Sequence, residues 1–380
     1  MTGTTHDWLP DRHLGVSATL SHADELIGEI SDLLFLYQTQ EGGIVGLREE
    51  QDGSVSKTVV DRVAPMPRKI PLLVADALVA LRAAIEHTIF AEVEQVDGPL
   101  NEKAAKLVEM PASETYDAFE EWKKKRRRNG PASLQAGSEL VRRIDGLQPF
   151  HRQKNPQMHP LARLVSHTNH AKHRTPAVTA VRIAALYEDD RRPKSIGELP
   201  QRQEAPVRAG DVLCVTPLGA WVPVTLFPTV GINRPGTDEW PILLNELDEI
   251  ATWVRTQAVP RLITGADPPT PTLPTRYAIS VEHEDERRAI ATGSTTSAAT
   301  RHAQRLGAAS SRIDLIELLG SMDCSLDSAQ IEAWLAQIPD HEVIERVSRL
   351  QATDGKDHAT MQRNLRVLEQ LRTEAVGFTG

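Results

Sequence analysis

Apolar residues recur at helical spacing in four long segments of the chain. In residues 21–38, leucines and isoleucines repeat every three or four positions, and Ser21 stands three residues before Asp24, which is the spacing of a capping box. Residues 70–94 form the most apolar of these segments and follow a cluster of prolines. The pattern predicts helices over residues 21–38, 70–94, 160–174 and 241–263.

Two other segments alternate in the manner of β-strands. Residues 43–63 contain two runs rich in β-branched residues, and the Asp52-Gly53 pair between them is typical of a hairpin turn. Residues 206–230 include VLCVTPLGAWVPVTLF, which alternates around a Pro-Leu-Gly turn. We therefore expect two β-hairpins inserted among helices, in a fold that is mainly α (α+β).

A chain of 380 residues is long enough for two domains. Four prolines fall within seven residues of the segment GADPPTPTLPTR, which favours an extended linker. We expect a helical domain over residues 1–264, a proline-rich linker over 265–276 and a smaller, mainly helical domain over 277–380. This last domain is expected to open with a hairpin over 277–292 and to contain helices over 325–338 and 354–376.

Composition and charge limit the possible functions. The chain has 43 basic and 52 acidic side chains, and this net charge of −9 argues against a surface coated with nucleic acid. Cys214 and Cys324 are too few for a disulfide framework or a cysteine-based zinc site. No segment has the apolar length of a membrane span or a signal peptide. We expect a cytoplasmic protein that does not contact membranes.

Six consecutive cations, Lys123–Arg128, interrupt this otherwise acidic chain. They close a segment of helical character and are followed by Asn129 and Gly130. Cations are stabilised at the C-terminal end of a helix, so a solvated helix end is the favoured interpretation. A patch that binds phosphate is the alternative.

Charged side chains also occur within the apolar segment 70–94. At about 100° per residue, Asp76 and His87 fall on one side of a helix, and Arg82 and Glu86 fall roughly 140° away. One interpretation is a structural Arg82–Glu86 pair beside an incidental histidine. The other is an Arg-x4-His motif in which His87 transfers a proton and Arg82 holds a phosphate, supported by Asp76 and Glu86.

A second group of cations and histidines lies in HPLARLVSHTNHAKHRTP, residues 159–176. A helix there places basic and imidazole side chains within about 60° of one another, at Arg163, His167, His170 and Arg174. This side could be a solvated face, a metal site at His167 and His170, or an anion-binding surface. In the last case Lys172, His173 and Arg174 contact phosphate or carboxylate, helped by His170 and Arg163.

The order of these motifs resembles a widespread group of bacterial proteins with the pattern D-x-L-H-N-L-R-S-x-L-D-H, then Q-P-Y, then N-x-D-K-H-R. Here the matching segments are VADALVALRAAIEH, LQPF and NHAKHR, within residues 20–263. The first motif also resembles the Arg-x4–6-His signature of HEPN-type helical domains, many of which are metal-independent ribonucleases. The resemblance implies a HEPN-like helical bundle and a homodimer with a site shared between two motif helices. In that site a ribose 2′-hydroxyl attacks the phosphate, with His87 as the proton-transfer residue and Arg82 as the phosphate stabiliser.

The chain departs from these patterns at four positions. Val79 and Ala80 replace His-Asn, Ala83 follows Arg82 in place of a polar residue, and Ala171 replaces the aspartate of the last motif. These departures leave room for a relative that has lost catalysis.

Three functional hypotheses follow. The first is an RNA-binding protein or metal-independent endoribonuclease of a defence or toxin type, with RNA and a second copy of the chain as partners. The second is a noncatalytic helical interaction protein in which the same polar residues form a buried network. The third is a closed pocket near His173 for a small anion. The sequence contains no glycine-rich phosphate loop, no GxSxG and no HExxH, and we expect no cofactor and no metal.

Overall fold

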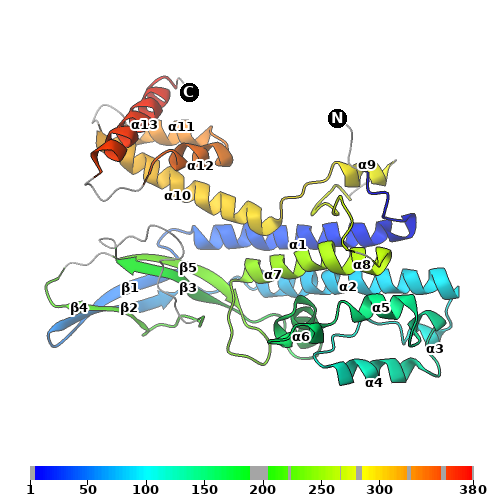
Figure 1. Ribbon diagram of the computed structural model, residues 1–380. Coiled ribbons are helices and arrows are strands. Elements are labelled where there is room, and N and C mark those ends of the chain that lie inside the picture. Colours follow the sequence, from blue (N-terminus) through cyan, green and yellow to red (C-terminus); the bar gives the residue numbers. More distant parts are fainter. Residues whose placement is uncertain are drawn as a thin grey trace. The chain divides into compact units, whose positions relative to one another are not determined.

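The computed structural model divides into two compact units, which are described separately (Figure 1). The division falls after Ala299, and the first unit holds the described residues up to that point. The structure describes residues 5–188, 204–220, 224–265, 267–279, 285–322, 327–351 and 357–378.

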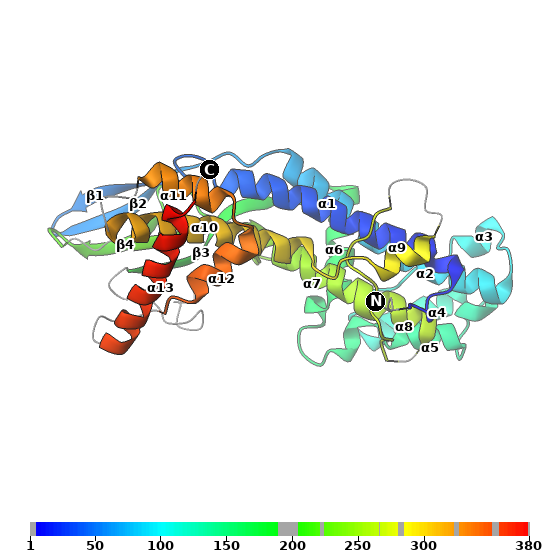
Figure 2. The same cartoon turned by 90° about the horizontal axis from the view of Figure 1, so that it is seen from above.

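The first unit is built on two long helices, α1 (Leu14–Gln38) and α2 (Lys69–Asp97). Each buries an apolar stripe, for example Ile30 of α1 and Ile85 of α2, at 1% exposure or less. Figures 1 and 2 show α7 (Leu243–Trp253) running beside both helices. These predicted helices are confirmed, and their packing forms the core of the unit.

The predicted start of the first helix is wrong. α1 begins at Leu14, seven residues before Ser21, and Ser21 is 1% exposed inside the helix. Its hydroxyl donates to the carbonyl oxygen of Tyr277 at 2.9 Å and accepts from the Tyr277 amide at 3.0 Å. The serine therefore joins two distant segments instead of capping a helix.

The first predicted hairpin is confirmed and the second is wrong. β1 (Val45–Asp52) and β2 (Val55–Val63) pair antiparallel around Gly53, whose φ of 60° favours glycine. The strands predicted within 206–230 form as β4 (Val212–Pro217) and β5 (Val224–Ile232), but β4 pairs with β2. The expected turn at Pro217-Leu218-Gly219 is present, with the Ala220 amide donating to the Pro217 carbonyl oxygen at 3.0 Å, and residues 221–223 after it lie outside the described residues.

β5 pairs instead with a strand that the sequence pattern did not reveal, β3 (Thr179–Glu188). Both strands of this second sheet bury apolar side chains, including Val181, Ile183, Val230 and Ile232. β4 is largely exposed along its length. Burial of apolar side chains thus explains why β5 pairs with β3, whereas β4 pairs with β2 as a third strand of the hairpin sheet.

Shorter helices complete the first unit. In Figure 1, α4, α5 and α6 lie on the side of α2 away from α1. The predicted helix over 241–263 is α7 and α8, separated by a π-helical turn over Val254–Ala258 just before Pro260, which cannot donate a hydrogen bond. The remaining helices of this part are α3 (Glu102–Ala105), α4 (Tyr116–Arg126), α5 (Glu139–Asp145), α6 (Pro160–His173) and α8 (Val259–Thr264).

The predicted linker and the observed division differ in position. Leu273 and Tyr277 are 0% and 4% exposed within the core of the first unit, and the Trp8 indole donates to the carbonyl oxygen of Pro271 at 2.9 Å. The described residues 265, 267–279 and 285–299 therefore belong to the first unit. The hairpin expected over 277–292 is wrong, because its second half forms a helix, α9 (Glu286–Ala291). Residues 280–284 lie outside the described part.

The second unit is helical. It contains most of α10 (Ala298–Met322) and then α11 (Ser328–Ala336), α12 (Asp340–Ser348) and α13 (His358–Val376). Leu315, Trp334 and Leu371 belong to its separate apolar core. The helices predicted over 325–338 and 354–376 are present where described; residues 325–326 and 354–356, and Cys324, lie outside.

Candidate functional site

The side chains of the Arg-x4-His motif point to different sides of α2. Asp76 and His87 are exposed, in a stripe that also includes Leu72 and Val79. Arg82 lies on another side and is only partly exposed. This arrangement agrees with the angular separation expected from helical spacing.

Arg82 joins α2 to α6. Its Nη1 donates to the Thr168 hydroxyl at 2.9 Å and to the Asn169 Oδ1 at 3.0 Å. Its Nε lies 3.5 Å from a carboxylate oxygen of Glu86, which realises the expected i,i+4 pair. The guanidinium thus makes contacts within the chain that hold two helices together.

Glu86 extends this connection to the chain before α4. Its Oε2 accepts a hydrogen bond from the Met110 amide at 2.9 Å. Burial raises the pKa of the Glu86 carboxyl, and the Met110 amide and the Arg82 charge only partly oppose this rise. Glu86 is therefore a half-buried carboxylate that links α2, α6 and the segment before α4.

His87 is free of such contacts. Its side chain is exposed, and it makes no hydrogen bond or ion pair with any residue that the structure describes. The same holds for Asp76 within the described ranges. One chain therefore does not bring Arg82 and His87 together on one surface, although His87 is open to solvent.

Helix α6 begins at a histidine cap. The His159 Nδ1 accepts from the Leu161 amide at 3.2 Å, and Pro160 occupies the first helical position. Burial lowers the pKa of His159 to about 4, with further lowering by the charges of Arg152 and Arg163. The ring edge also packs against Trp253 of α7, with centroids 5.0 Å apart.

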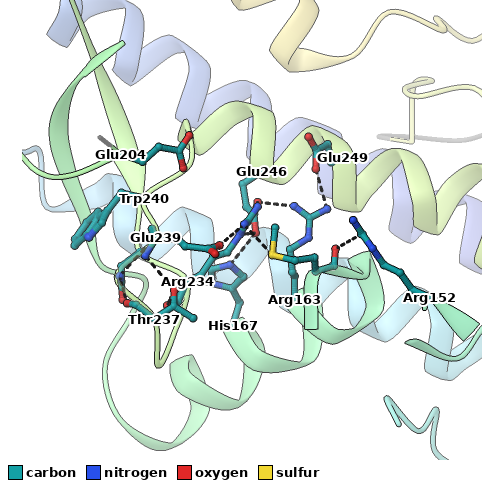
Figure 3. A network of polar contacts seen from close by, with 12 residues as sticks. Arg152, Arg163, His167, Glu204, Arg234, Thr237, Glu239, Trp240, Glu246 and Glu249 are labelled. Atoms are coloured by element: carbon teal, nitrogen blue, oxygen red, sulfur yellow. Dashed lines mark hydrogen bonds and ion pairs between the residues drawn. The ribbon is translucent and has the colours of Figure 1, made fainter. Parts of the chain in front are cut away.

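A buried ionic network connects α6 to α7 (Figure 3). Glu246 is 1% exposed and accepts from Arg163 at 2.6 Å and from Arg234 at 2.7 and 3.1 Å. His167 lies 3.4 Å from the same carboxylate. Burial by itself raises the pKa of Glu246, but hydrogen bonds from His167 and Arg234 and the charge of Arg163 lower it to about 2.

This network corrects the place of Arg163. The sequence placed Arg163 on an exposed anion-binding surface, yet it is 6% exposed and its guanidinium is bonded to Glu246 and Glu249. Sequence reasoning missed Glu246 and Arg234. Glu246 had a signal, because it occupies an apolar position of α7 among buried Leu243, Leu247 and Ile250.

The C-terminal end of α6 is a separate, exposed surface. The side chains of Lys172, His173 and Arg174 are exposed and make no polar contact with the described part of the chain, and the His170 ring contacts the Thr175 hydroxyl at 3.1 Å. A cavity lined by His167, His170 and Ala171 holds only about 10 Å³, roughly one water molecule. This cavity is too small for the anionic ligand of the third hypothesis.

Other signals add little to the site. Among the described residues, no three histidine, cysteine, aspartate or glutamate side chains come close enough together to hold a metal ion. No described helix has the length and apolar character needed to cross a membrane. Comparisons of the chain with protein-family models, curated proteins and solved structures found no match.

Proposed function

We propose that the first unit binds RNA, and that the exposed end of α6 contacts its phosphate backbone. The observation that carries this proposal is the cluster Lys172, His173 and Arg174, which has no carboxylate partner among the described residues of a chain with net charge −9. When unpaired cations neutralise the phosphates of a nucleic acid, they release the counter-ions that were condensed on it. This release is the main driving force of phosphate contacts. Such contacts give binding without base specificity.

Binding is tested by the anisotropy of a labelled, mixed-sequence single-stranded RNA at several salt concentrations. We expect Lys172→Gln with Arg174→Gln to weaken binding about tenfold and to reduce the salt slope by about 1–2, because two phosphate contacts are lost. The control is Lys69→Gln with Arg142→Gln, two exposed cations that are paired with Glu29 and Glu139. Equal affinity of both variants and the wild type would contradict the proposal.

RNA cleavage by a homodimer is the second candidate, and the exposed stripe of α2 favours it. Leu72 and Val79 are 52% and 39% exposed on the side that carries His87. Apolar side chains on an exposed helix face suit contact with a second copy. In a homodimer of the kind that the HEPN resemblance implies, the His87 of one copy would act with the Arg82 of the other, two side chains that a single chain does not bring together.

The chemistry would follow the metal-independent route that the HEPN resemblance implies. His87 would accept the proton of the ribose 2′-hydroxyl while this oxygen attacks the adjacent phosphorus. The bond from phosphorus to the 5′-oxygen would break and the 5′-oxygen would take a proton from water, giving a 2′,3′-cyclic phosphate and a free 5′-hydroxyl. Arg82 would stabilise the charge on the phosphate.

Cleavage is tested with an RNA pool in EDTA. We expect His87→Ala to abolish cleavage, and His22→Ala, at an exposed histidine of α1, to retain it. Val79→Glu should separate the dimer in sedimentation and remove activity with it. Cleavage that survives in His87→Ala would refute the catalytic role.

A noncatalytic interaction protein is the competing function, and the internal bonds of Arg82 favour it. Arg82 is held by Thr168, Asn169 and Glu86, as a structural residue would be. Absence of cleavage by the wild type, together with loss of stability in Arg82→Ala, would support this function.

A further inference from the structure

The basic run Lys123–Arg128 is divided into paired and unpaired cations. Lys123 and Lys124 pair with Glu120 and Glu121 one turn earlier, at 2.5 and 2.6 Å. Pairs of this kind on a helix surface satisfy the two lysines locally.

Arg126 is buried and anchors the end of α4. It is 1% exposed, donates to the carbonyl oxygens of Leu107 and Trp122 at 2.9 Å, and pairs with Glu109 at 2.9 Å. A Cβ at Gly130 would stand 2.7 Å from the Arg126 carbonyl oxygen, so the chain turns there in close contact with the helix. The end of α4 is therefore anchored by Arg126 to residues 107–109.

Lys125, Arg127 and Arg128 project from this anchored end. All three side chains are exposed, and none of them forms an ion pair or hydrogen bond with the residues that the structure describes. A hydrogen bond to Glu121 raises the pKa of Lys124, and the positive charge of Arg127 opposes this rise. The like charges are thus close enough to repel one another, and a bound anion would relieve that repulsion.

Two further cations, Lys103 and Lys106, lie just before Leu107, the residue whose carbonyl oxygen accepts from Arg126. Lys106 directly precedes Leu107, and Lys103 lies one turn before it in α3; both side chains are exposed and without polar partners in the described part. The same segment continues to Met110, which bonds to Glu86 of α2. The basic end of α4 is therefore connected by direct contacts to the helix that carries Arg82.

The surroundings favour a nucleic acid over a lipid surface. A helix that lies on a membrane exposes an apolar face beside its cations. In α4 the large apolar side chains near the basic end are buried, Phe119 at 0% and Trp122 at 6% exposure. The exposed side chains from Lys124 to Arg128 are all cations, which suits a phosphate backbone.

We propose that the basic end of α4, defined as Lys125, Arg127 and Arg128, is a second contact surface for the phosphate backbone of RNA. This inference rests on the proposed RNA binding at the end of α6. In Figure 1 both helices lie on the side of α2 away from α1. Rigid anchoring through Arg126 lowers the ordering cost of binding.

The test uses the full chain with Lys125, Arg127 and Arg128 changed to Gln, and a labelled single-stranded RNA. We expect affinity to fall at least tenfold and the salt slope to fall by about 2, since about 0.7 of the slope comes from each phosphate contact. The matched control changes Lys69, Arg142 and Arg288 to Gln; these exposed cations are paired with carboxylates. Arg127→Lys with Arg128→Lys keeps the charge and should keep the affinity. Circular dichroism and thermal unfolding confirm that each variant is folded.

The outcomes separate this inference from the proposed function. Wild-type binding with an unchanged slope in the Gln variant overturns the α4 surface and leaves the α6 proposal standing. No binding by the wild type overturns both. An equal loss of RNA affinity in the Gln variant and in the control variant overturns the α4 surface. The loss would then follow from the change in net charge and not from these three positions. Binding to anionic phosphatidylserine vesicles that needs these cations, with RNA binding unchanged, also overturns it.

Discussion

At the scale of single residues, the most consequential side chain is a glutamate that occupies an apolar helix position. Glu246 lies among buried leucines of α7 and is compensated by Arg163 and Arg234. A buried carboxylate without partners would be strongly destabilising, so these arginines are needed for the fold. That requirement removes Arg163 from the set of residues free to bind a ligand.

Glu246→Gln should destabilise the protein by about 3–5 kcal/mol, because two arginines would keep buried charge without a counter-charge. The matched control is Glu249→Gln, which removes the other carboxylate bonded to Arg163 but sits 63% exposed and should cost about 1 kcal/mol or less. Urea unfolding at pH 7 measures both values. A loss of unfolding free energy in Glu246→Gln as small as that in Glu249→Gln would show that the network does not stabilise the fold.

The pH dependence of this contribution has a definite sign. The pKa of Glu246 is lowered in the folded chain from 4.5 to about 2. Its stabilisation is therefore present above pH 4.5 and is lost as the pH falls toward 2. The difference between the wild type and Glu246→Gln should narrow over that window.

At the scale of elements, α6 is positioned by its first residues. His159 supplies the capping acceptor, and its ring also packs on Trp253 of α7. Burial lowers the pKa of His159 and so favours its neutral ring. The contact at which α6 begins is therefore sensitive to pH.

We expect His159→Asn to reduce the acid sensitivity of the fold. In the folded chain the pKa of His159 is lowered from 6.5 to about 4, so stability is complete above pH 6.5 and declines as the pH falls toward 4. Asparagine keeps a capping oxygen and does not titrate. The loss of unfolding free energy between pH 7.5 and 5 should be smaller in the variant, by on the order of 1–2 kcal/mol. His22→Asn, at an exposed histidine, is the control, and a pH dependence identical in wild type and His159→Asn would count against the burial argument.

At the scale of the whole molecule, the proline-rich segment belongs to the core of the first unit. Leu273 is fully buried, and the Thr275 amide and the Arg276 carbonyl oxygen bond to Ser294. Prolines exclude regular secondary structure but do not prevent burial of the residues between them. Composition indicated a linker, while apolar contacts set the division after residue 299.

Leu273→Ala should therefore destabilise the first unit by about 2–4 kcal/mol, as other buried leucines do. Leu72→Ala, at a leucine that is 52% exposed, should change stability by less than about 1 kcal/mol. Urea unfolding of the full chain followed by circular dichroism measures both. A mild effect at Leu273, equal to that at Leu72, would mean that the segment is a true linker.

The sequence by itself determined that α1, α2, α6 and α7 are helices, and it determined the first hairpin and the different sides of α2 taken by Arg82 and His87. These features depend on periodicity and on turn residues close together in the chain. The partner of β5, the burial of Arg163 and the place of residues 265–299 were decided only by the tertiary structure. Strand pairing and charge compensation join residues that lie far apart in sequence, such as Arg163 and Glu246. Local sequence patterns therefore do not predict which distant residue becomes the partner.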